Sequence, residues 1–329
     1  MSSETVTKSS VVCRLSKPLP TGTIDSHNHI IPPDFDRFPT VSTAEYQPKP
    51  HTISDAVQFY AQTSGLGIST PRMVLTQVSV YGHDNSALLS GVKELGNNGR
   101  GVVECTPDVS IEQLEKWWQL GIRGVRINLV SVSRKVDEPE MKRMLQAYTD
   151  MLGQTAMSDA SRKWVIDLHF PLGYMSMLLS ILRRLDGADR VRWCIDHFGG
   201  LKFKTDAPNF QPGNDDPYTV SGFKELVTLV TDQSLPEVYV KLSAAYRVDA
   251  DYPNEHVLRR LEPFGKELVS KAEDRVLWAS DWPHTRFENV DSVPFVEACY
   301  EWCGGEGEEG QRRREKLFRS NSEKLWDMA

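Results

Sequence analysis

Short, nearly continuous apolar runs alternate along the chain with longer segments in which apolar residues recur every three or four positions. The short runs include VLTQV, GVVEC, WVIDL and VYVKL. Apolar runs without strict alternation are typical of parallel strands that are buried on both faces of a sheet. We therefore predict strands at residues 22–25, 72–79, 101–105, 121–127, 163–168, 190–195, 237–242 and 275–279.

The longer segments have the period of amphipathic helices. Residues 110–120 show the signals well, because Ser110 can cap the first turn and Gly121 follows the last. Eight strands, each followed by a helix, in about 300 residues predict an α/β protein with a (β/α)8 TIM barrel. The predicted helices are 53–65, 85–96, 110–120, 141–152, 174–186, 221–231, 255–271, 293–302 and 321–328.

A doubly wound sheet is the structural alternative. The doubly wound folds that bind nucleotides are disfavoured, because no G-x-G-x-x-G or G-x-x-x-x-G-K-[ST] motif follows a predicted strand. No linker or internal repeat divides the chain, so residues 21–329 are predicted to form one domain behind a loosely ordered arm at 1–20. The longest stretch without periodicity, residues 199–219, follows the sixth strand, and a loop of that length is often an active-site wall.

Composition narrows the function classes. The chain has 38 basic and 45 acidic residues, a net charge of −7, which argues against a nucleic-acid-binding protein. No segment has the apolar length of a signal peptide or the roughly 18 apolar residues of a membrane span, so we expect a cytoplasmic location. The cysteines are odd in number and widely spaced, which predicts free thiols; they are Cys13, Cys105, Cys194, Cys299 and Cys303.

Polar residues gather where four predicted strands end. The segments are DSHNH after the first strand, DLH after the fifth, DHFG after the sixth and SDWPH after the eighth. In a barrel of this type the carboxyl ends of the strands meet at one face, where active sites form. Five of the eight histidines lie in these segments, so we predict that this face carries the chemistry; they are His27, His29, His169, His197 and His284.

This set of residues predicts a metal-assisted reaction. His27 and His29 are two positions apart, so on an extended strand they point the same way. His169 can add a third nitrogen and Asp281 a carboxylate, a set that suits one divalent ion, above all Zn²⁺. Asp281 is the predicted general base, and His197 is predicted to act as a general acid or base or to polarise a carbonyl. His284 either joins the site or braces Asp281.

Segments along nearly the whole barrel resemble the amidohydrolase superfamily. They are IDSHNHI, AEYQP, VLTQVSVYGHDNSALL, GIRGVRINLV, CIDHFGG, VYVKLSAAYR, ASDWPH and NSEKLW. Within the superfamily they are similar to the amidohydrolase-2 group, which includes the 2-pyrone-4,6-dicarboxylate lactonase and 4-sulfomuconolactone hydrolase family. The resemblance implies an anionic lactone as substrate, held by strand-end arginines and a tyrosine.

On this resemblance, Arg126 and Arg247 match carboxylate-binding arginines and Tyr46 matches the binding tyrosine. The planar fork of arginine suits a carboxylate, although a structural ion pair is the alternative for each. Gln77, at the end of the second strand, is a further candidate for hydrogen bonding to substrate. No second arginine aligns after VRIN, with Arg134 and Lys135 only nearby, so the substrate carries one carboxylate or is a larger or more apolar lactone.

The lactonase that this chain resembles works without a metal and has another residue where His169 stands. His169 therefore favours a bound cation, and a metal-free mechanism is the alternative. The leading prediction is a hydrolase that opens a carboxylate-bearing pyrone or muconolactone-type ring. A metal-dependent non-oxidative decarboxylase with the same ligands is the runner-up, and a catalytically silent binding barrel is a third reading. We expect a small anionic substrate, neither nucleic acid nor membrane as a partner, and a monomer or homodimer.

Overall fold

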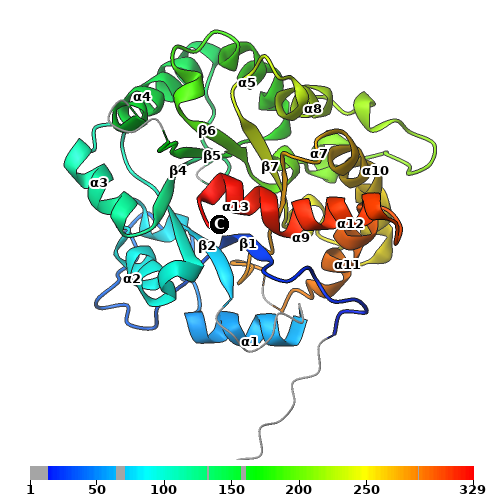
Figure 1. The fold of residues 1–329 in the computed structure, drawn as a ribbon, viewed down its shortest axis with the longest axis horizontal. Helices are drawn as coiled ribbons and strands as arrows, with labels where there is room; N and C mark the ends of the chain where they lie inside the picture. Colours follow the sequence, from blue (N-terminus) through cyan, green and yellow to red (C-terminus); the bar gives the residue numbers. More distant parts are fainter. Residues whose placement is uncertain (1–13, 64–70, 132, 157–160, 288) are drawn as a thin grey trace, which may run out of the picture.

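The computed structural model describes residues 14–63, 71–131, 133–156, 161–287 and 289–329. Its eight strands are parallel and pair in chain order, which confirms the predicted barrel (Figure 1). A bridge between Asn28 and Trp282 links the first strand to the segment after the eighth. The strands are β1 (Ile24–Asn28), β2 (Arg72–Thr76), β3 (Gly99–Val103), β4 (Ile122–Asn128), β5 (Val165–His169), β6 (Arg192–Ile195), β7 (Val238–Leu242) and β8 (Val276–Trp278).

Helices surround the sheet as an outer ring (Figure 1). Nine of the longer ones lie where the sequence predicts helices: α1 (Ile53–Thr63), α2 (Ser86–Leu95), α3 (Ile111–Gln119), α4 (Glu138–Ala156), α5 (Met175–Leu182), α8 (Phe223–Thr231), α10 (Glu255–Lys271), α11 (Val293–Trp302) and α13 (Asn321–Trp326). A tenth, α12 (Glu308–Glu315), lies where no helix is predicted. The short helices α6 (His197–Gly200), α7 (Phe203–Asp206) and α9 (Ala245–Val248) follow β6 and β7 and carry no periodic signal in the sequence.

Several element ends differ from the prediction by a few residues, and three differences bear on the structure around the site. The strand β1 continues to Asn28, so His27 lies on the strand and not beyond it. The helix α4 begins at Glu138, because the Asp137 carboxylate accepts a hydrogen bond from the Glu140 amide at 2.8 Å. The segment 199–219 is more ordered than a plain loop, since Phe210 packs on Phe264 with ring centroids 4.9 Å apart. Residues 64–65 of the first predicted helix lie outside the described residues.

The predicted arm is described only from residue 14 onward. Its last part is anchored, because Leu19 is buried and Arg14 forms a 2.7 Å ion pair with Asp291. Cys13 lies outside the described residues, and the other four cysteines are buried free thiols. Among the described helices, none combines the length and apolar character that crossing a membrane requires.

The C-terminal helix closes the end of the barrel where the strands begin. Figure 1 shows α13 and the C-terminus crossing the centre of the ring of strands. Leu325 and Trp326 are fully buried there, in one cluster with Ile24, Val74 and other early strand residues. Arginines at the strand starts hold the chain end: Arg100 Nη2 donates to the Asp327 carbonyl at 2.6 Å. The site must therefore open at the other end of the barrel.

Replacing Trp326 with alanine is expected to lower the free energy of unfolding by about 3–5 kcal/mol, because a large buried side chain leaves a cavity under the barrel. Urea denaturation of the variant and the wild type measures this loss. Leu120→Ala is the control, since Leu120 is 47% exposed and its truncation should change stability by less than about 0.5 kcal/mol. Equal effects of the two substitutions would show that the C-terminal helix does not seal the core.

Candidate active site

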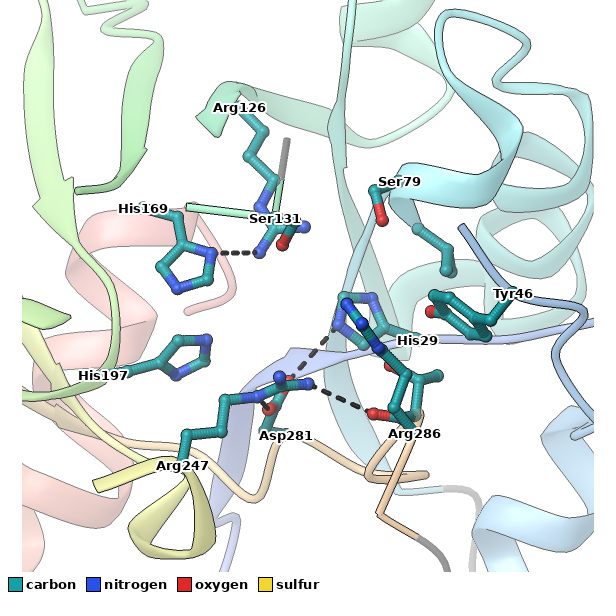
Figure 2. A pocket seen from close by; sticks show the side chains of 12 residues that line it. His29, Tyr46, Ser79, Arg126, Ser131, His169, His197, Arg247, Asp281 and Arg286 are labelled. Carbon is teal, nitrogen blue, oxygen red and sulfur yellow. Dashed lines mark hydrogen bonds and ion pairs between the residues drawn. The ribbon is translucent and has the colours of Figure 1, made fainter. Parts of the chain in front are cut away.

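A cavity opens at the carboxyl ends of the strands, with about 380 Å³ of empty space. It contains seven of the ten residues predicted for the site (Figure 2): His29, Tyr46, Arg126, His169, His197, Arg247 and Asp281. The remaining lining residues are Val78, Ser79, Ser131, Thr285 and Arg286. The side chains come from both halves of the chain, and barrel closure brings them to one place.

Asp281 lies at the centre of the polar contacts. Its Oδ2 accepts hydrogen bonds from the Tyr246 hydroxyl at 2.5 Å and from Arg247 Nε at 2.8 Å. Its Oδ1 faces His29 Nε2 at 3.3 Å and His27 Nε2 at 3.5 Å. Burial favours the neutral acid, but the Arg247 guanidinium and the nearby His197 hold the pKa of Asp281 well below its usual range. Asp281 is therefore a carboxylate at neutral pH and can accept a proton.

Backbone strain at this position is consistent with a functional site. Asp281 has a φ of 61°, in the left-handed region that residues with a Cβ rarely adopt. The conformation is held by hydrogen bonds across the barrel seam, since the Asp281 amide donates to the His27 carbonyl at 3.1 Å. His197 and His284 also have positive φ values. Strained residues of this kind cluster at functional sites.

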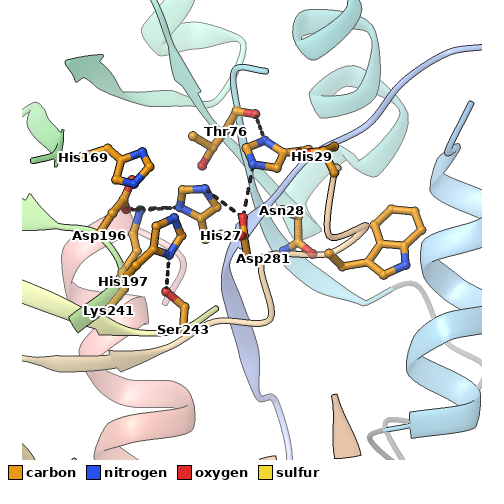
Figure 3. Close-up of polar contacts among 12 residues, drawn as sticks. His27, Asn28, His29, Thr76, His169, Asp196, His197, Lys241, Ser243 and Asp281 are labelled. Atoms are coloured by element: carbon orange, nitrogen blue, oxygen red, sulfur yellow. Dashed lines mark hydrogen bonds and ion pairs between the residues drawn. The ribbon is translucent and has the colours of Figure 1, made fainter. Parts of the chain in front are cut away.

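Burial keeps three of the site histidines neutral. His29 is oriented by a contact of 2.7 Å between its Nδ1 and the Thr76 carbonyl, which points its Nε2 toward Asp281 (Figure 3). Burial lowers the pKa of His27 and of His169 well below the usual value, and lowers that of His197 to about 4. Neutral imidazole is the form that binds metals.

Two arginines stand on either side of this group. Arg126, on β4, donates from Nη1 to the Gln77 carbonyl at 3.0 Å, while its Nη2 lies 3.5 Å from His169 Nδ1. Arg126 Nε has no hydrogen-bond partner within the described residues. Arg247, on α9, remains partly exposed to the cavity. Both guanidinium groups can contact an anion held between them.

A buried lysine that sequence reasoning missed lies beneath the histidines. Lys241 Nζ contacts Asp167 at 2.7 Å. It also contacts Asp196 at 2.9 Å and His27 Nδ1 at 3.1 Å, three residues that Figure 3 shows together. All four side chains are fully buried. The signal was present, because a lysine inside the apolar run VYVKL needs a buried partner. Through these contacts Lys241 holds His27 in position from below the cavity.

The described residues form three groups that could hold a metal ion: His27 with His197 and Asp281; His169 with Asp196 and His197; and His27 with Asp167 and Asp196. The third group already surrounds the Lys241 ammonium and does not fit a cation. The first fits one, because His27 Nε2 and Asp281 Oδ1 are buried and have no hydrogen-bond partner within the described residues.

The four residues predicted to bind one metal ion do not form a single group in the structure. Within the described residues no candidate group unites His27, His29, His169 and Asp281. His197, predicted as an acid or base, belongs to the first and second groups, with its ring centroid 4.9 Å from those of His27 and His169. The cause is the barrel geometry: His169 is at the end of β5, next to β6 and its His197, and opposite β1.

Three predicted residues do not line the cavity: His27, which lies beneath it, Gln77 and His284. Gln77 Nε2 donates to the carbonyls of Gly82 and Asp84 at 2.9 and 2.8 Å, so its amide holds the loop after β2. The buried His284 ring packs on Tyr246, with centroids 5.2 Å apart, behind Asp281. This position matches the bracing alternative for His284. Tyr246 itself was missed, although it directly precedes Arg247 after the seventh strand.

Buried histidines make the fold sensitive to acid. Burial lowers the pKa of His197 and His284 to about 4 from 6.5, so the unfolded state binds more protons between these values and stability falls as pH drops through this range. His27 and His169 act in the same direction. Asp25 and Asp167 act oppositely, because burial raises their pKa values to about 6 from 3.8. The four histidines together lower the stability in acid by more than the two aspartates raise it.

We therefore expect the free energy of unfolding to be lower at pH 4.5 than at pH 7 by roughly a few kcal/mol. Urea denaturation at the two pH values measures the difference. His284→Gln should reduce the difference, whereas His256→Gln, at an exposed position, should leave it unchanged. Equal or greater stability at pH 4.5 would contradict the expected net sign.

The geometry can be compared with known proteins. The amidohydrolase family profile matches residues 24–328. The chain is 28% identical to 4-sulfomuconolactone hydrolase of Hydrogenophaga intermedia over 84% of its own length and 79% of the relative's. It is 27% identical to 2-pyrone-4,6-dicarboxylate hydrolase of Comamonas testosteroni, over 85% of its own length and 87% of the relative's.

Solved structures share the fold. A probable 2-pyrone-4,6-dicarboxylic acid hydrolase of Acinetobacter baumannii with bound citric acid has a TM-score of 0.68 at 20% identity, covering 93% of this chain and 99% of that one. A Burkholderia multivorans amidohydrolase with bound zinc has a TM-score of 0.64 at 17% identity, with the same coverage. With the family profile spanning the whole barrel, the chain belongs to the amidohydrolase family of enzymes.

Proposed function

We propose that this enzyme hydrolyses the ring ester of a carboxylate-bearing lactone, with Asp281 as general base. The observation that carries the proposal is the Asp281 carboxylate, which is buried, ionised and directed into a cavity between two guanidinium groups. The two curated relatives named above are lactone hydrolases, which supports the reaction class.

The reaction needs one proton acceptor and one proton donor. Asp281 Oδ1 takes a proton from water as the water oxygen bonds to the lactone carbonyl carbon. The bond between that carbon and the ring oxygen then breaks, and the ring oxygen receives the proton back from Asp281. Tyr246 and Arg247, both bonded to Oδ2, hold the carboxylate in place and leave Oδ1 for this exchange. The product is one open-chain hydroxy acid, or its keto form.

The remaining cavity residues are proposed to bind and polarise the substrate. Arg126 Nε and the Arg247 guanidinium are placed for the ring carboxylate, and Tyr46 lies on the opposite wall, where Arg286 stacks on its ring 5.2 Å from the centroid. In the metal-free alternative, neutral His197 is placed to donate a hydrogen bond to the lactone carbonyl. Because the charged groups proposed to bind the substrate here are arginines, we propose a small anion as substrate. The net charge of −7 does not oppose this, since the local field at the site is positive.

A divalent cation would be held by His27, His197 and Asp281, with His29 Nε2 beside them. When bound, such an ion supplies a polarised water or carbonyl oxygen near neutral pH. We expect purified enzyme to contain about one equivalent of metal, zinc above all, by elemental analysis. Chelation should lower activity at least tenfold, and added Zn²⁺ should restore it. Full activity of metal-free protein would favour the metal-free alternative.

Ring-opening assays test the proposed reaction. Pyrone and muconolactone carboxylates are incubated with the enzyme, and the acid released is titrated while any CO₂ is trapped. We expect acid without CO₂, and no acid with the Asp281→Asn variant as control. CO₂ without ring opening would instead identify the decarboxylase. No reaction on either substrate class, in metal-loaded protein, would leave the barrel as a binding module.

A further inference from the structure

A second chamber opens from the cavity on one side of the barrel mouth. It spans about 1850 Å³ of empty space, including space open to solvent, against about 380 Å³ counted in the same way for the central cavity. Both are lined by Ser131, His169, His197, Arg247 and Arg286, which Figure 2 shows around the central cavity. The two chambers are therefore continuous, and the shared residues form the passage between them.

The second chamber lies over the later strands. The loops after β4, β5, β6, β7 and β8 contribute to it, whereas Tyr46 and Ser79 line only the central cavity. The segment 199–219, predicted as an active-site wall, supplies part of its outer side through Leu201, Lys202 and Thr205. A substrate centred on Asp281 can thus extend past His169 and His197 into this chamber.

The linings of the two chambers differ in chemistry. Charged and polar groups dominate the central cavity, while the second chamber adds an apolar surface made by Leu129, Pro171, Tyr174, Leu201, Val248 and Phe287. Lys135 and Lys202 lie at its exposed rim, and neither forms an ion pair within the described residues. The Asp206 carboxylate accepts hydrogen bonds from its own turn, at the Lys202 amide and the Thr205 hydroxyl. An apolar group fits this surface, and a cationic one does not.

We propose that the substrate is a lactone with an apolar arm, a phenyl or short alkyl group on the ring that occupies the second chamber while the ring and its carboxylate occupy the central cavity. The inference rests on the proposed lactone hydrolysis and names its substrate class. Burial of apolar surface strengthens binding by about fourfold for each methylene. A compact pyrone leaves this surface empty, so the arm raises kcat/KM.

The test compares one ring with and without the arm. A 2-pyrone carboxylate and its phenyl-substituted form are hydrolysed by wild-type enzyme, and we expect kcat/KM to be at least tenfold higher with phenyl. Thr205→Trp, on the exposed wall of the second chamber, should reduce kcat/KM for the phenyl lactone at least five times more than for the compact one. Lys202→Trp, at a second position of the wall, should show the same selectivity.

The matched control is Lys204→Trp, which places the same side chain on α7 at an exposed position outside the chamber lining. It should retain the wild-type preference, and thermal melting should show that all three variants fold. A gain below tenfold in wild type, or equal losses in Thr205→Trp and Lys204→Trp, overturns the apolar arm while lactone hydrolysis stands. Failure of the metal-loaded wild type to open either lactone overturns the proposed function itself.

Discussion

Replacing Asp281 with asparagine is expected to lower kcat for lactone opening by about 10²–10⁴-fold, the usual contribution of a positioned general base. Asparagine keeps the shape and can still accept hydrogen bonds from Tyr246 and Arg247, but it cannot take a proton from water. Steady-state kinetics on a pyrone carboxylate measures the loss. The effect should fall on kcat more than on KM, because the lost interaction acts in the transition state.

Asp281 also belongs to the group that fits a metal, so the variant's metal content must be measured beside its activity. Loss of kcat at unchanged metal content assigns the effect to the missing base. Asp274→Asn, at an exposed position, serves as the control and should leave kcat unchanged. Wild-type kcat in Asp281→Asn would refute the mechanism, whatever the metal content.

Replacing Lys241 with methionine is expected to lower the free energy of unfolding by about 3–5 kcal/mol. Methionine has a similar length but removes the ammonium between Asp167 and Asp196, which leaves two buried carboxyl groups facing each other. Burial lowers the pKa of Lys241, but the two carboxylates raise it above the usual value, so the native protein has a full positive charge here. Urea denaturation at pH 7 measures the loss.

A second substitution separates charge from packing. In the Lys241→Met background, Asp167→Asn removes one of the two opposed carboxyl groups and should recover part of the lost stability. Lys93→Met, on the exposed face of α2, should change stability by less than about 0.5 kcal/mol. An effect of Lys241→Met no larger than that of Lys93→Met would mean that the buried cluster contributes little to the fold.

The fold could be predicted because its signals are local. All eight strands and the nine predicted helices lie where periodicity places them, with ends that differ by a few residues. The short helices α6, α7 and α9 could not be predicted, since four residues carry no period. The conformations of α6 and α9 depend on positive φ angles at His197, Phe198 and Ala244, which the packing of the loops imposes.

The candidate site could be predicted in part. Strand-end histidines, Asp281 and the two arginines meet in one cavity, because parallel strands of a barrel end at the same face. The role of Gln77 stays a prediction, since an amide at a strand end can serve a loop carbonyl, as its Nε2 does here, as well as a substrate. The grouping of His169 with His197 depended on which strands are neighbours and on how their side chains turn.

The sequence by itself determined the barrel, the end of it that carries the chemistry, and the residue types available there. Periodicity and strand-end position are properties of neighbouring residues, so they can be read without coordinates. Only the tertiary structure decided which groups touch: Lys241 meets His27 across 214 positions, and Asp281 meets Tyr246 across 35. Such contacts are set by barrel closure and by the exclusion of water, which forces each buried charge to find a partner. The same closure places an apolar chamber beside a polar cavity, a juxtaposition that no local pattern contains.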